Sequence, residues 1–267
     1  AATSPGNPRA HHGVELGRFF LNKFSASGAL TAIEHFEAAV KEDPDNAAAY
    51  AGLAEAYNQL GTVFIGVKPP TNVRLLAIRA ATRAIQLNPN LAEAYAALGY
   101  TTLHELDWTG AETALRRAIE LNPRYTPAHQ TYASYLAAQR RFAEAIDEAR
   151  RGLDLEPASV RARQILAWML YFDRQYDAAT RELLTILQMD RTYALAHFRL
   201  GQVFIVTGRW EEAIPPLQAA VDITDRAPAA LGLLAMAYGG GGQRAKAQRI
   251  VEELEDRSET QHVPPGA

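Results

Sequence analysis

The sequence contains no cysteine, which excludes disulfides, thiolate metal sites and cysteine nucleophiles. It also has no run of about 18 uncharged apolar residues, so no membrane-spanning helix is expected. Neither sign of charge dominates, because 27 basic and 30 acidic residues give a net charge of −3. That balance argues against a general nucleic-acid binder, in which a basic excess or stripe is usual.

Catalytic signatures are weak throughout. His104-Glu105 lacks the second histidine, four residues after the first, that a zinc-protease helix requires. The phrase GGGGQRAK at 239–246 lacks the G-K-[ST] ending and the preceding strand of a phosphate loop. His11-His12 is interpreted as incidental. We therefore expect no catalytic residue, no metal site and no cofactor. An enzyme with an unrecognised site is the rival class, and it would require clustered, desolvated Glu, Asp or His in a cleft.

Proline-centred phrases mark an internal repeat. The phrases NPN, NPR and EPA place Pro89, Pro123 and Pro157 at steps of 34 residues, and Arg191 and Asp225 continue the series. The first step, from Pro44 to Pro89, is 45 residues long and so contains an insertion of 11. A period of 34 residues is that of the tetratricopeptide helix–turn–helix.

The residues inside each period support two helices that cross closely. Small residues recur on the second helices at Ala32, Ala77, Ala111, Ala145, Ala179, Ala213 and Ala247. One such pair cannot bury its apolar face alone, so stacked neighbours must stabilise each other. The sequence predicts an all-α, right-handed superhelical solenoid of about seven repeats, at 13–46, 47–91, 92–125, 126–159, 160–193, 194–227 and 228–261.

Around this solenoid, which spans 13–261, the remaining segments carry their own expectations. Residues 1–12 are expected to be a flexible linker, and 262–267 the start of a truncated further repeat. The insertion at 61–71 is apolar and could serve either binding or packing at the edge.

Two departures from the repeat affect the predicted helices. Pro215 and Pro216 fall inside a second helix, which should therefore kink or start late. Gly239 to Gly242 predict a mobile turn in the last repeat, which we expect to be the least stable.

The longest phrases identify a narrower likeness. ELGRFFLNKFSASGALTAIEHFEAAVKEDPDNAAAYAGLAEAYNQLG, the insertion ending in KPP, and the segment LDWTGAETALRRAIELNPRYTPAHQTYASYLAAQRRFAEAIDEARRGLDLEP carry it. They resemble the tetratricopeptide regions of bacterial winged-helix regulators, serine/threonine kinases and adenylate-cyclase-type signalling proteins. The chain itself has no kinase Gly-rich loop, HRD or DFG.

The resemblance implies that the first helix of each repeat lines a concave groove. The side chains that would face it are Arg18, Asn58, Tyr100, His104, Gln130, Arg161, Gln164, Trp168, Tyr171, Phe198, Arg199 and Gln202. Aromatic residues and Arg dominate binding hot spots, which favours a peptide site. The alternative is that these aromatics pack between adjacent helices.

Two other candidate sites were weighed. Some tetratricopeptide domains clamp a carboxyl terminus with Lys and Asn, but the matching positions here are Gly17, Leu21, Gly52, Glu93 and Ala97. Arg116, Arg117, Arg150 and Arg151 recur one repeat apart on second helices and predict a solvated outer ladder.

The favoured function is a protein- or peptide-binding module of a larger bacterial signalling or regulatory protein. We expect it to be cytoplasmic, with no nucleic-acid or membrane partner. A self-association module that forms a homodimer is the alternative.

Overall fold

The structure is a computed structural model that describes residues 7–22, 25–62 and 70–260. In these ranges the chain forms fourteen helices and no strand. The first helices of the pairs are α1 (Pro8–Leu21), α3 (Ala47–Leu60), α5 (Ala92–His104), α7 (Thr126–Ala138), α9 (Val160–Phe172), α11 (Ala194–Val206) and α13 (Pro228–Gly240). The second helices are α2 (Ala26–Glu42), α4 (Pro70–Leu87), α6 (Trp108–Leu121), α8 (Phe142–Leu155), α10 (Tyr176–Met189), α12 (Trp210–Ile223) and α14 (Arg244–Thr260).

The helix boundaries reproduce the period found in the sequence. From α5 onward, first helices begin at residues 92, 126, 160, 194 and 228, which are 34 apart. Second helices begin at 108, 142, 176, 210 and 244, again 34 apart. The prediction of an all-α solenoid of helical repeats is confirmed.

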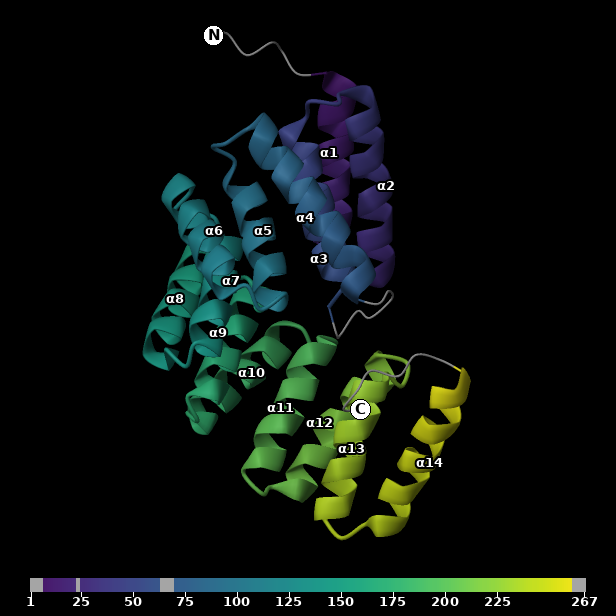
Figure 1. Ribbon diagram of the computed structural model, residues 1–267. Coiled ribbons are helices and arrows are strands. Elements are labelled where there is room, and N and C mark those ends of the chain that lie inside the picture. Colours follow the sequence, from purple (N-terminus) through teal and green to yellow (C-terminus); the bar gives the residue numbers. More distant parts are fainter. Residues whose placement is uncertain (1–6, 23–24, 63–69, 261–267) are drawn as a thin grey trace. The chain divides into compact units, whose positions relative to one another are not determined.

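The chain divides into two compact units, residues 1–135 and 136–267, with the boundary inside α7. Within the first unit, α1 packs on α2, α2 on α3 and α3 on α4 (Figure 1). Within the second, the series from α8 to α14 continues in the same way. First helices also contact the next first helix, as α3 does α5 and α11 does α13, so they form a layer of their own.

Alanines and glycines let the two helices of a repeat approach closely. The predicted alanines of the second helices, from Ala32 to Ala213, are fully buried. On first helices, a Cβ added at Gly201 would lie 2.3 Å from Leu217 Cγ, and one at Gly99 would lie 2.6 Å from Leu115 Cγ. These contacts explain why the period keeps small residues at the crossing.

The start of the chain differs from the expected linker at 1–12, because α1 begins at Pro8. The Asn7 side chain accepts a hydrogen bond from the Arg9 amide at 3.0 Å and caps the helix. Proline suits the first helical position because its missing N–H would have no helical partner there. Residues 1–6 and 262–267 lie outside the described residues, as does most of the 61–71 insertion.

The two prolines of α12 do not delay the helix, so that alternative was wrong. The helix begins at Trp210 and contains both Pro215 and Pro216. Arg209, directly before it, donates two hydrogen bonds to Glu212, at 2.7 and 2.5 Å. This pair closes the first turn ahead of the prolines, and Pro216 is itself buried.

A left-handed residue ends each first helix from α5 onward. The residues with positive φ are Leu106, Arg140, Arg174, Gly208 and Gly242, which are 34 apart. At Gly208, the next amide, of Arg209, donates to Phe204 O at 2.8 Å, as in a Schellman cap. Of the four glycines at 239–242, two therefore complete α13 and only Gly242 needs the left-handed region.

Candidate peptide-binding surface

The expected groove residues divide between the two units, and each unit is described by itself. The first unit contains Arg18, Asn58, Tyr100, His104 and Gln130. The second contains Arg161, Gln164, Trp168, Tyr171, Phe198, Arg199 and Gln202.

Four of these side chains are buried, which favours the packing interpretation for them. Asn58, Gln130 and Gln164 keep 5–7% of their surface exposed, and Phe198 keeps 8%. Asn58 Nδ2 donates to Ala97 O at 2.9 Å, and the Thr101 hydroxyl lies 2.8 Å from Asn58 Oδ1. Asn58 therefore joins α3 to α5 rather than presenting its amide to a ligand.

The first unit has a small pocket of about 100 Å³ between these helices and α4. Three of its lining residues, Asn58, Tyr100 and His104, were predicted; Arg74 and Thr101 were missed. The His104 ring stacks at a tilt on Tyr100, with centroids 4.5 Å apart. Drug-sized ligands occupy pockets of about 300–1,000 Å³, so this one fits no more than a side-chain tip.

The environment of His104 favours the neutral imidazole. Although the residue stays partly exposed, loss of hydration lowers the pKa of His104, and the Arg74 guanidinium lowers it further. Glu105 acts in the opposite direction but pairs with Arg74 at 3.0 Å. In the same unit Arg18 is exposed, and its guanidinium lies 3.8 Å from Glu93.

The second unit gathers the aromatic candidates on one surface, which we call the Trp168 face. It is formed by Arg161, Trp168, Tyr171 and Phe172 of α9 and by Arg199 and Gln202 of α11. Trp168 and Tyr171 stack with ring centroids 4.6 Å apart and planes 11° apart. Phe172 lies against Trp168 at 4.5 Å, tilted by 59°. Spacings of three and four residues place these rings on one side of the helix.

Arg199 extends this stack from the neighbouring first helix. Its guanidinium carbon lies 3.3 Å from the centre of the Trp168 ring, within the range of a cation–π interaction. Arg199 Nη1 donates to Gln202 Oε1 at 2.8 Å, while Arg199 Nε is buried and has no hydrogen-bond partner. Burial lowers the pKa of Arg199 to about 10, although the hydroxyls of Tyr171 and Tyr193 act to raise it.

The sequence interpretation missed Phe172, Val206 and Met236 on the first-helix layer of this unit. They are 40%, 47% and 54% exposed, large values for apolar side chains. A signal was available, because Phe172 and Val206 are 34 residues apart, and Met236 follows Gln202 and Trp168 by the same step.

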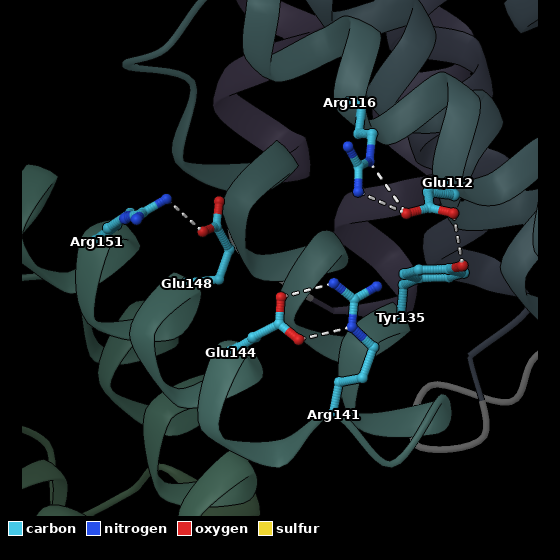
Figure 2. A network of polar contacts seen from close by, with 7 residues as sticks. All are labelled: Glu112, Arg116, Tyr135, Arg141, Glu144, Glu148 and Arg151. Carbon is cyan, nitrogen blue, oxygen red and sulfur yellow. Dashed lines mark hydrogen bonds and ion pairs between the residues drawn. The ribbon is translucent and has the colours of Figure 1, made fainter.

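The predicted arginine ladder is neutralised within its own helices. In the first unit, Arg116 and Arg117 pair with Glu112 and Glu120, at 2.8 and 3.2 Å. In the second, Arg150 and Arg151 pair with Asp147 and Glu148, at 3.5 and 2.9 Å. Figure 2 shows Arg116 with Glu112, and separately Arg151 with Glu148 and Arg141 with Glu144. The ladder therefore presents alternating charge rather than a basic stripe.

Within the described ranges, no three His, Asp or Glu side chains come together as a metal site would require. No described helix has both the length and the apolar character needed to cross a bilayer.

Comparison with known proteins supports the repeat assignment. Two family models, each described as tetratricopeptide repeat, match residues 29–63 and 166–230. The chain therefore carries tetratricopeptide repeats, and such repeats are in general protein-interaction scaffolds. A search of curated proteins gave no match.

Solved structures share the fold at low sequence identity. A tetratricopeptide protein of Parabacteroides merdae is 14% identical, with a TM-score of 0.61, over 94% of this chain and 93% of that one. TTC0263 of Thermus thermophilus is 19% identical, with a TM-score of 0.61, over 73% and 99%. PilF of Pseudomonas aeruginosa is 17% identical, with a TM-score of 0.57, over 79% and 95%.

Proposed function

We propose that the chain is a scaffold that binds a protein or peptide segment on its layer of first helices, with the Trp168 face as the main contact. The mechanism is equilibrium binding without bond chemistry. The observation that carries the proposal is the partly exposed stack of Trp168, Tyr171 and Phe172 with Arg199 laid over it. Trp, Tyr and Arg are the residue types that dominate binding energy at interfaces.

The resemblance of the sequence to tetratricopeptide regions of bacterial regulators supports a role within a cytoplasmic signalling or regulatory protein. Such a role requires recognition of another chain rather than catalysis.

The test begins with a random nonapeptide phage library selected on the immobilised chain. The affinities of the enriched peptides are then measured by fluorescence anisotropy for the wild type and for Trp168→Ala. If Trp168 is an anchor, the substitution weakens binding by about 1–3 kcal/mol. Trp108→Ala is the matched control, because Trp108 is a partly exposed tryptophan at the start of α6, in the other unit.

Thermal unfolding of both variants separates binding from packing. Unchanged affinity together with a lower melting temperature for Trp168→Ala would assign the ring to the core. Self-association is the competing function, and light scattering tests it directly. A dimer that the selected peptide fails to dissociate, with no effect of Trp168→Ala on peptide binding, would favour that alternative.

A further inference from the structure

The positive charge of Arg199 has no negative partner in the described chain. The guanidinium contacts the Trp168 ring and Gln202, and it forms no ion pair with any described carboxylate. Asp190 is the carboxylate that affects the nearby Tyr193, but its own oxygen accepts from the amide and hydroxyl of Thr192. A partly buried cation without an anion is costly, so its presence requires an explanation.

Other arginines of this unit show what an ordinary structural role involves. Arg163, on the same helix as Trp168, pairs with Glu182 at 2.5 Å and so joins α9 to α10. Arg151 pairs with Glu148 at 2.9 Å, and Arg209 with Glu212 at 2.5 Å. Arg199 differs from these because aromatic rings and an amide surround it where the others have a carboxylate.

The charges that face Arg199 are also positive or neutral. Arg161, one helix earlier, is close enough to lower the pKa of the Tyr193 hydroxyl. The Tyr171 and Tyr193 hydroxyls, which are neutral at pH 7, are the remaining titratable groups that act on Arg199. The Trp168 face therefore complements a negative charge.

Apolar surface lies on both sides of Arg199. Its helix, α11, contacts α9 on one side and α13 on the other. Phe172 of α9 is 40% exposed, Val206 of α11 47%, and Met236 of α13 54%. A segment that ended at Arg199 would leave one of these side chains uncovered, so the occupant continues in both directions.

We infer that Arg199 receives the side-chain carboxylate of an internal Glu or Asp in a peptide segment with apolar residues on both sides of that acid. The inference rests on the peptide-binding function proposed above, and it names the class of partner. A charge-assisted hydrogen bond to the guanidinium would supply the missing anion, and the flanking apolar residues would cover Phe172 and Met236.

The experiment uses nonapeptides selected from the random library on the full chain. Each peptide that contains an acid is synthesised with Glu or Asp and with the matching Gln or Asn, and both forms are titrated by fluorescence anisotropy. The protein variants are Arg199→Met, which keeps an apolar stem of similar length, and Arg181→Met, an exposed arginine of the second helix α10.

The inference predicts that acids flanked by apolar residues are enriched. It also predicts that the amide forms bind the wild type about tenfold more weakly or worse, and that Arg199→Met binds acid and amide forms alike. Arg181→Met should behave as the wild type. Arg199→Met should melt no lower than the wild type, because replacing an unpaired buried charge by an apolar group is neutral or stabilising.

Three results would overturn the inference while leaving peptide binding intact. The selected peptides could lack acids, Arg199→Met could still prefer the acid forms, or inorganic phosphate could displace the peptide far better than acetate does. The last result would assign the site to phosphate. If no peptide is enriched at all, the proposed function fails as well, so the two failures are distinguishable.

Discussion

Three glycines near the ends of α11 and α13 should respond differently to the same substitution, Gly→Ala. Gly208 has φ +73°, and a Cβ there would have no heavy atom within 4 Å. The change therefore tests backbone conformation alone. Gly239 is helical, and its Cβ would lie 4.0 Å from Ala247 Cβ, which is ordinary contact. Gly240 is also helical, but its Cβ would lie 2.3 Å from the Trp210 ring.

The expected magnitudes follow from these surroundings. Gly208→Ala should destabilise by about 1 kcal/mol, because L-residues pay about 1–2 kcal/mol in the left-handed region and alanine gains back some unfolded-state entropy. Gly239→Ala should stabilise by about 0.5–1 kcal/mol, since alanine is the better helix former. Gly240→Ala should destabilise by about 1–3 kcal/mol, because the tryptophan ring must move.

Urea unfolding followed by circular dichroism at 222 nm measures all three, and thermal melts should shift by about 2–4 °C per kcal/mol. A destabilising Gly239→Ala, or a neutral Gly208→Ala, would refute the assignment of which glycines the turn needs. That result would also remove the explanation of the recurring left-handed position.

Three further predictions concern the same repeat physics. Leu106→Gly should stabilise by about 0.5–1 kcal/mol in the same urea assay, because Leu106 has φ 62° and is 66% exposed, so it loses little packing; Leu106→Ala is the control and should give no such gain. Phe36→Ala should cost about 3–5 kcal/mol and lower the melting temperature, since the fully buried ring fills the space over Gly17 and Gly52; a loss below about 1 kcal/mol would contradict the packing described for the first unit. His104 has a lowered pKa, so the unfolded state binds more protons below about pH 6.5, and stability should fall as the pH drops through that value; unfolding of His104→Gln across pH 5–8 should show a shallower dependence, and an equal slope in both proteins would assign the effect to other groups.

The fold was predictable because the repeat appears in the sequence at several independent positions. Pro89, Pro123 and Pro157 fix the spacing, and small residues such as Gly99 and Gly201 fix where the helices cross. The start of α1 was misplaced because its signal is a single cap, Asn7 followed by Pro8, which has no counterpart one period later. Likewise, the prolines of α12 were expected to delay the helix, since the Arg209–Glu212 pair that closes its first turn was not weighed.

The candidate site was harder to predict from spacing. Helical periodicity places Asn58 and Trp168 at related positions, but it does not show that Asn58 uses its amide on Ala97 while the Trp168 ring stays partly exposed. The pairing of Arg199 with Trp168 depends on two neighbouring helices at once, so no single-helix pattern contains it. The exposure of Met236 depends on what the facing repeat leaves uncovered.

The most direct test of the central claim is hydrogen–deuterium exchange of the full chain with and without a selected peptide. Binding on the Trp168 face predicts slower exchange in α9 and α11, extending to α13, with the second helices α8 and α10 unchanged. Protection confined to second helices, or to the first unit alone, would contradict the account.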